Sequence, residues 1–123
     1  DFVFKRNQIA QKYNQSFASN DKLTPIECKN NCYSANHIYI IKFNLEKIGK
    51  TRDQIYQELK SNGIGVNVHY LPIYLHPYYQ SLGYCKGLCP EAEKIYEKII
   101  TIPIYPTLSD DNILKIIELV NKI

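Results

Sequence analysis

Residues 37–43 (HIYIIKF) constrain the fold more than any other segment, because they form a strand pattern with apolar side chains on both faces. A short run of β-branched and aromatic residues is typical of a strand. Successive side chains of a strand point to opposite faces of its sheet. An apolar side chain on each face requires cover on each face, so we expect helices on one side and a further packing partner on the other.

Amphipathic helices are predicted at both ends of the chain. Ile9, Tyr13 and Phe17 recur at intervals of four, which predicts a helix over residues 1–18. Near the other end, Ser109 is a suitable N-cap, and an apolar helical stripe follows it to the last residue.

Two further helices are predicted in the interior. Thr51 and Gln54 have the spacing of a capping box, and Gly63 suits a left-handed helix end, so a helix is expected over residues 51–61. Pro90 suits the first turn of the second helix. We expect its buried stripe to consist of Ala92, Ile95, Tyr96 and Ile99, with Glu91 and Glu93 at the positive end of the helix dipole.

Two more strands complete the prediction. Residues 66–71 alternate apolar and polar side chains, and residues 101–105 form a short strand that Pro103 assigns to an edge or a bulge. Residues 19–34 are read as a loop, and residues 72–83 as a loop with a short helical piece. The order of elements fits an α+β fold, with about three strands and helices packed on one face.

Length and composition exclude several classes of protein. The chain has 123 residues, 45% of them hydrophobic, and a formal net charge of +3. This composition is that of a globular domain, and the dispersed charge does not indicate nucleic-acid binding. No apolar run approaches the roughly 20 residues of a membrane-spanning helix, so no membrane partner is expected. The chain contains no Met, so we expect it to begin inside a longer polypeptide.

The candidate binding residues are His69, Tyr70, Tyr74 and His76. His69 lies near the end of a predicted strand, and the tyrosines and His76 follow in a Pro-rich loop. Imidazole and phenol groups can bond to phosphate or sugar oxygens, and their rings can stack on a base or a cofactor. The alternative is a hydrogen-bonded histidine on the surface of a sheet, which would be the better reading for a histidine that stood alone.

The four cysteines form two Cys-x-x-x-Cys pairs, Cys28 with Cys32 and Cys85 with Cys89. Two such pairs have a spacing that a structural zinc site could use. The long segment between the pairs and the adequate core argue against zinc, and disulfides would require an oxidising compartment. Free thiols in loops, with no metal, are the expectation.

A longer pattern resembles a known family. The residues that carry the resemblance are Arg52-Asp53, Leu59, Gly63-Ile64, His69-Tyr70-Leu71-Pro72, Tyr78-Tyr79, Gly83, Pro90-Glu91-Ala92-Glu93 and Ile102-Pro103-Ile104-Tyr105-Pro106. In this order they resemble the C-terminal domain of sugar-nucleotide aminotransferases of the DegT/DnrJ/StrS type. The HYLPIYLHPYY loop is most similar to that of enzymes that aminate a UDP-4-keto-6-deoxy sugar on the way to pseudaminic acid.

The resemblance implies the small C-terminal domain of a fold-type I aminotransferase that uses pyridoxal 5'-phosphate (PLP). Residues 1–18 would be the end of the helix that links the two domains, and residues 19–123 the small domain. The large domain, with its Schiff-base lysine, is absent from the chain. No catalytic residue is therefore assigned to this chain, and the chain alone is expected to be inactive.

The same resemblance implies the substrates and partners of the whole enzyme. Glutamate would supply the amino group to the C4 keto carbon of a UDP-sugar, in a cytoplasmic homodimer that serves surface or flagellar glycan synthesis. His69 and Tyr70 would contact the substrate, with Tyr74 and His76 behind them. The alternatives are a stand-alone β-α-β ligand-binding module and a zinc-stabilised interaction domain.

Overall fold

The computed structural model describes residues 1–26, 28 and 31–123. Three short strands form one antiparallel sheet in the order β1-β2-β3. In chain order the elements are α1 (Phe2–Phe17), β1 (Leu23–Pro25), β2 (Tyr39–Phe43), α2 (Leu45–Ile48), α3 (Arg52–Ser61), η1 (Ile73–Leu75), α4 (Pro77–Ser81), α5 (Pro90–Tyr96), β3 (Ile99–Ile102) and α6 (Asp110–Asn121).

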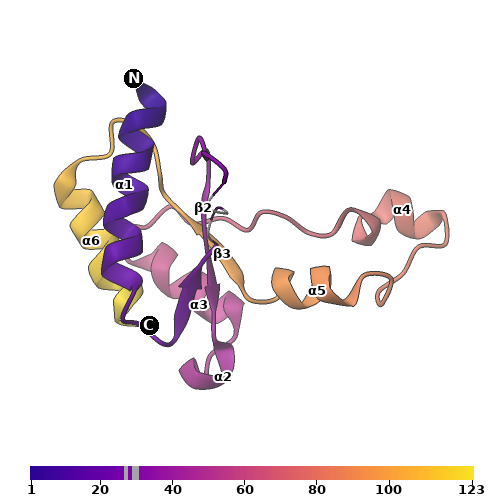
Figure 1. The fold of residues 1–123 in the computed structure, drawn as a ribbon. Helices are drawn as coiled ribbons and strands as arrows, with labels where there is room; N and C mark the ends of the chain where they lie inside the picture. The colour runs from indigo at the N-terminus through magenta and orange to yellow at the C-terminus, as the bar shows by residue number, and fades with distance from the viewer. Residues whose placement is uncertain (27, 29–30) are drawn as a thin grey trace.

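The predicted α+β architecture is confirmed, with helices α1 and α6 side by side on one face of the sheet (Figure 1). The central strand β2 places Ile41 and Phe43 on that face, with no more than 1% of each exposed. Tyr13 and Val120 bring the two helices into the same cluster, and both are fully buried. The periodic stripes of the terminal helices therefore form the core.

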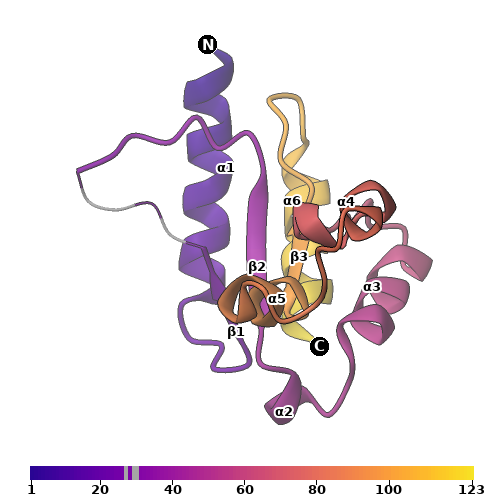
Figure 2. The same ribbon diagram turned by 90° about the vertical axis from the view of Figure 1, so that its right-hand side faces the viewer.

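The other face of the sheet carries less cover. Side chains of β2 alternate, so Ile40 and Lys42 point away from α1 and α6; Ile40 is partly buried and Lys42 is exposed. Figure 2 views the molecule from this side, with α5 in front of the strands.

Helix α3 confirms the predicted capping box. The Gln54 backbone N–H donates to the Thr51 hydroxyl at 3.2 Å, and the Thr51 N–H donates to the Gln54 side chain at 2.8 Å. Gly63 follows the helix with φ of +80°, the left-handed conformation that glycine tolerates best. Ile55 and Leu59 face the core, with at most 1% exposed.

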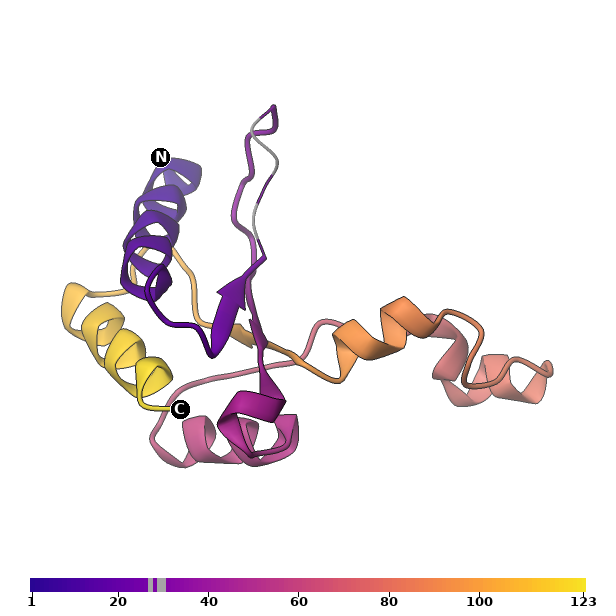
Figure 3. The ribbon, with the colours of Figure 1, turned by 60° about the horizontal axis from the view of Figure 1, so that its bottom comes forward.

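The loop between the core and β3 extends far from the sheet. Residues 72–96, called the arm, contain η1, α4 and α5 and project away from α1 and α6 (Figures 1 and 3). The predicted short helix near residues 77–82 is confirmed as α4. Six large apolar side chains of the arm are exposed, namely Ile73, Tyr78, Leu82, Tyr84, Leu88 and Ile95.

Two strand predictions need correction. Residues 66–71 form no strand: only Asn67 pairs, in an isolated bridge with Thr101 on β3. The Asn67 side chain accepts the Val68 N–H at 2.8 Å, which takes a donor that a ladder would use. The predicted loop, in turn, contains β1, whose last residue Pro25 lies at the edge of the sheet, where a missing N–H is tolerated.

The prediction for residues 90–105 is also partly wrong. Helix α5 ends at Tyr96, and β3 begins at Ile99 and ends before Pro103. The expected apolar stripe of α5 does not form, since Ile95 is 48% exposed. The buried side chain of α5 is instead Glu93, which is only 8% exposed.

Candidate functional site

His69 lies where the chain leaves the core for the arm, and its ring is held from two sides. Nδ1 lies 2.8 Å from the hydroxyl of Thr101, and Nε2 lies 3.4 Å from the amide nitrogen of Asn67. Thr101 is 6% exposed, and its backbone exchanges two hydrogen bonds with Asn67, of 3.0 and 2.7 Å. The imidazole is therefore anchored to the outer edge of β3.

Tyr70 forms the second half of this site. Its ring lies edge-on to the His69 ring, with centroids 4.4 Å apart, and the peptide bond between the two residues is cis. Tyr70 is nevertheless 71% exposed. An anchored imidazole beside an exposed aromatic ring provides a hydrogen-bonding atom and a stacking surface at one point.

Tyr74 belongs to η1 of the arm and is 8% exposed. Its phenol donates to the Glu93 carboxylate at 2.7 Å, and the backbone N–H of Gly87 donates to the same carboxylate oxygen at 2.7 Å. Burial and the bond to Glu93 raise the pKa of Tyr74 to about 12. The bonds from Tyr74 and Gly87 hold the pKa of Glu93 below its usual value.

His76 is the fourth predicted residue, and it is exposed at the start of α4. Its backbone carbonyl accepts from Gln80, but its ring makes no hydrogen bond within the described residues. The structure thus brings His69 and Tyr70 together, ties Tyr74 to the arm and leaves the His76 ring open. A ligand role for each of the four stays a prediction.

Sequence reasoning did not single out Thr101, Asn67 or Glu93. Thr101 lay in a predicted strand and Asn67 on the same face of another as His69, which was the available signal for their proximity. Glu93 carried no such signal, because a glutamate in the first turn of a helix is usually exposed.

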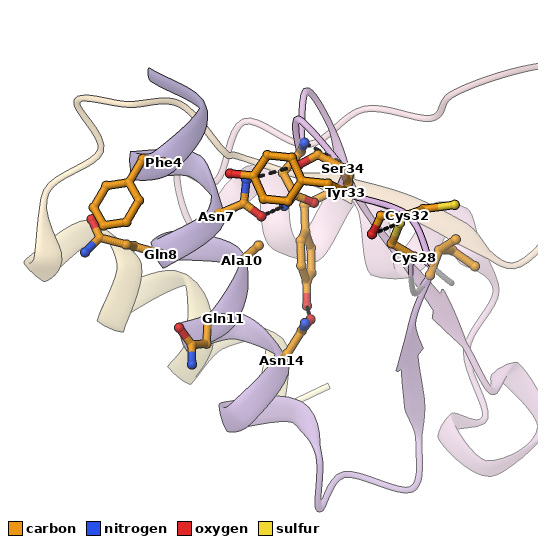
Figure 4. A pocket seen from close by; sticks show the side chains of 13 residues that line it. Phe4, Asn7, Gln8, Ala10, Gln11, Asn14, Cys28, Cys32, Tyr33 and Ser34 are labelled. Atoms are coloured by element: carbon orange, nitrogen blue, oxygen red, sulfur yellow. Dashed lines mark hydrogen bonds between the residues drawn. The ribbon is translucent and has the colours of Figure 1, made fainter. Parts of the chain in front are cut away.

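A separate pocket of about 450 Å³ lies between α1 and a wall that includes Ile26, Cys28, Tyr33 and Tyr39 (Figure 4). None of the four predicted residues lines it. Asn7 spans the pocket wall, donating to the Ser34 carbonyl at 3.0 Å and accepting from Asn36 at 2.9 Å. The Tyr39 hydroxyl donates to Asn14 at 2.6 Å. These bonds fasten Ser34, Asn36 and Tyr39 to α1, so the amides mainly serve the fold.

Cys28 and Cys32 also line this pocket, and all four cysteines are free and exposed. Among the described residues, no three His, Cys, Asp or Glu side chains are placed to hold a metal ion. In the same residues, no helix is long and apolar enough to cross a membrane.

The lysines are the groups that could form an imine with a carbonyl compound. Six of them pair with carboxylates in the described part of the chain: Lys12, Lys47, Lys50, Lys86, Lys94 and Lys122. No described lysine is buried. None of these amines therefore has the water-shielded surroundings in which a lysine becomes a nucleophile.

Comparison with known proteins places this arrangement in a family. Residues 1–121 match the DegT/DnrJ/EryC1/StrS aminotransferase family. The protein MJ1066 of Methanocaldococcus jannaschii is 37% identical over 97% of this chain and 31% of its own length. The spore coat polysaccharide biosynthesis protein SpsC of Bacillus subtilis is 33% identical over 100% of this chain and 32% of its own length.

Comparison with solved structures supports the same family. PseC of Helicobacter pylori, an aminotransferase involved in the biosynthesis of pseudoaminic acid, superposes with a TM-score of 0.88 at 30% identity, over 98% of this chain and 32% of PseC. The PLP form of Spr1654 of Streptococcus pneumoniae, a proposed sugar aminotransferase, gives a TM-score of 0.87 at 33% identity, over 98% of this chain and 31% of Spr1654. This chain spans about a third of these relatives and belongs to the DegT/DnrJ/EryC1/StrS aminotransferase family.

Proposed function

We propose that this chain is the small C-terminal domain of a PLP-dependent sugar-nucleotide aminotransferase. The family match over residues 1–121 supports the reaction class, and Spr1654 is known in PLP and PMP forms. The domain would bind and cover the sugar nucleotide, while a larger domain carries the cofactor. Residues 1–18 would belong to the helix that joins the two.

The described residues of this chain do not fit PLP by themselves. The cofactor needs a lysine that is shielded from water and can lose its proton, and every described lysine is exposed or partly exposed. No cofactor step is therefore assigned to these residues. In the proposed enzyme PLP supplies the electron sink, and this chain supplies binding and orientation of the substrate.

The single observation that carries the site assignment is the His69–Tyr70 pair. Its imidazole is anchored to β3, while the neighbouring ring is 71% exposed and available to a ligand. We propose that this pair contacts the sugar nucleotide, with Tyr74 and His76 farther along the arm.

The proposed substrates are glutamate and a UDP-4-keto-6-deoxy sugar aminated at C4, in the cytoplasm, for surface or flagellar glycan synthesis. The likeness to PseC supports a sugar of the pseudaminic acid route. A homodimer is proposed as the working unit. The six exposed apolar side chains of the arm support contact with another domain or subunit, because such surfaces are seldom left facing water.

The test is amination by the whole product of the gene that encodes this chain. The purified protein is incubated with PLP, L-glutamate and a UDP-4-keto-6-deoxy sugar, and the products are identified by mass spectrometry. We expect an amino sugar that keeps the amino nitrogen of ¹⁵N-labelled glutamate. Absence of turnover with every nucleotide-linked keto sugar tried, in a protein that binds PLP, would contradict the proposal.

A second measurement tests the site within that enzyme. His69→Ala should raise the KM for the sugar nucleotide and leave the absorbance of bound PLP unchanged. His37→Ala is the control, since His37 is a solvent-exposed histidine that lies before β2, whereas His69 is partly buried. An unchanged KM in His69→Ala would remove His69 from the site and leave the reaction class standing.

A further inference from the structure

The hydrogen bonds around His69 define which of its nitrogens carries the proton. The amide of Asn67 has a fixed orientation, because its oxygen accepts the Val68 backbone N–H at 2.8 Å. Its NH₂ group must then be the end that lies 3.4 Å from Nε2 of His69. An amide NH₂ can only donate, so Nε2 of the neutral ring is the acceptor.

The other nitrogen follows from this. A neutral imidazole has one N–H and one lone pair, so an accepting Nε2 leaves the proton on Nδ1. Nδ1 lies 2.8 Å from the Thr101 hydroxyl oxygen, which accepts it. The position of Thr101 is fixed, because the residue is 6% exposed and its backbone is hydrogen-bonded to that of Asn67.

We infer that Thr101 and Asn67 are positioning residues that hold His69 as its Nδ1–H tautomer, so that Nε2 accepts a hydrogen bond from a sugar hydroxyl of the substrate. This inference rests on the proposed function for its ligand but not for its tautomer. The Asn67 contact at 3.4 Å is long, so the Nε2 lone pair can still bond a stronger donor.

Because Nε2 accepts in this tautomer, the ligand group that bonds to it must be a hydrogen-bond donor. A sugar hydroxyl can donate a proton to Nε2, whereas the oxygens of a UDP diphosphate carry none at neutral pH and only accept. The diphosphate is therefore excluded as the partner of Nε2. Hydroxyls of the hexose and of the ribose can both donate; we assign the hexose, and inhibition by UDP, which retains the ribose, distinguishes the two. Tyr70, edge-on to the imidazole and largely exposed, supplies the apolar surface beside that hydroxyl.

The first test measures the tautomer directly, without substrate. Long-range ¹H–¹⁵N correlation spectra of the ¹⁵N-labelled protein are recorded at about pH 8.5, above the ordinary imidazole pKa of about 6.5. His69→Gln identifies the His69 signals by their loss. We expect a protonated Nδ1 and an unprotonated Nε2. An Nε2–H tautomer in the unmodified protein would overturn the inference.

Two variants of Thr101 separate positioning from packing. Thr101→Val keeps the shape and removes the hydroxyl, so the Nδ1–H signature should weaken or disappear. Thr101→Ser keeps the hydroxyl and should restore it. Both are compared with the unmodified protein by circular dichroism, and an unchanged tautomer in a folded Thr101→Val would overturn the role of Thr101.

The second test uses the active enzyme. Thr101→Val should raise the KM for the sugar nucleotide by roughly two- to tenfold, the usual effect of one hydrogen bond, and leave inhibition by UDP alone unchanged. Thr101→Ser should behave like the unmodified enzyme. An equal loss of UDP inhibition, or an unchanged KM, would overturn the assignment to a sugar hydroxyl. An enzyme without aminotransferase activity would contradict the proposed function instead, and the nitrogen shifts would still decide the tautomer.

Discussion

The phenol of Tyr74 donates a 2.7 Å hydrogen bond to the carboxylate of Glu93, and this bond joins η1 to α5 across the arm. The Gly87 N–H donates to the same oxygen at 2.7 Å, so one buried carboxylate gathers three parts of the arm. A helix as short as α5, with seven residues, is marginal on its own. The network therefore gives the arm a defined shape before any partner covers it.

The first prediction follows from this network. Glu93→Gln replaces a charged acceptor by a weaker one and should loosen the arm while the core stays folded. Trypsin should then cut more quickly after Lys86, in the turn that Glu93 secures. The measurement is the rate of appearance of the two fragments by mass spectrometry.

Glu91→Gln is the matched control, because Glu91 lies in the same turn of α5 with its side chain 82% exposed and paired with Lys94. It should be cut at the rate of the unmodified protein. If Glu93→Gln and Glu91→Gln are cut equally quickly, the buried network does not order the arm.

The second prediction concerns pH. The folded pKa of Glu93 is lowered, so its contribution to stability is present above the ordinary glutamate pKa of 4.5 and is lost as the pH falls through the folded pKa. Tyr74 behaves in the opposite way. Its folded pKa of about 12 exceeds the ordinary 10.0, so its contribution is present below pH 10 and is lost as the pH rises towards 12.

The loss of the Glu93 contribution at low pH is checked by comparing the unmodified protein with Glu93→Gln. The quantity measured is the chemical shift of the Gly87 backbone amide, which reports the hydrogen bond to Glu93. The shift of the unmodified protein should move to that of Glu93→Gln as the carboxylate is protonated. A Gly87 shift that titrates with an apparent pKa above 4.5 would contradict a lowered pKa of Glu93.

The core was largely predictable because its signals are local and repeated. The Ile9, Tyr13 and Phe17 spacing and the Thr51 capping box each use only neighbours in sequence, and both form as expected.

The strand predicted from the alternation of residues 66–71 does not form, for a physical reason. Alternation shows that a segment is extended, but pairing depends on a partner edge, and the Asn67 side chain removes one donor from it.

The site was predictable only in part, since its contacts join residues far apart in sequence. His69 and Tyr70 are neighbours, so their proximity was expected. The bond between His69 and Thr101 spans 32 positions and depends on the register of an isolated bridge. The burial of Glu93 depends on the fold of the arm, which has no regular period from which it could be inferred.

The third prediction tests the cap of α3. Thr51→Ala removes the acceptor for the Gln54 N–H and should lower the free energy of unfolding by about 1 kcal/mol, within a range of about 0.5–2. Urea unfolding followed by circular dichroism measures the change. Thr107→Ala is the control: Thr107 is exposed and its side chain makes no hydrogen bond in the described residues, so the change there should be close to zero. If the two variants lower the free energy of unfolding equally, the Thr51 cap does not stabilise α3.

The fourth prediction compares the two faces of β2. Ile41→Val removes one methylene group from a fully buried side chain and should cost about 0.5–1.5 kcal/mol of unfolding free energy. Ile40→Val makes the same change on the opposite face, where the side chain is only partly buried, and should cost less. Urea unfolding of both variants gives the comparison. A larger cost at Ile40 would mean that the face away from α1 and α6 carries the tighter packing.

The fifth prediction concerns the exposed ring of the site and uses two tyrosines of almost equal exposure. Tyr70 and Tyr78 are 71% and 69% exposed, but only Tyr70 lies against the anchored imidazole of His69. In the proposed aminotransferase, Tyr70→Ala should raise the KM for the proposed sugar-nucleotide substrate by roughly five- to a hundredfold, the effect of losing one stacked ring. Tyr78→Ala should leave that KM unchanged. Steady-state kinetics at saturating glutamate, with bound PLP followed by absorbance, measure both. If Tyr78→Ala raises the KM as much as Tyr70→Ala, the substrate contact is not specific to the His69–Tyr70 pair and extends along the arm.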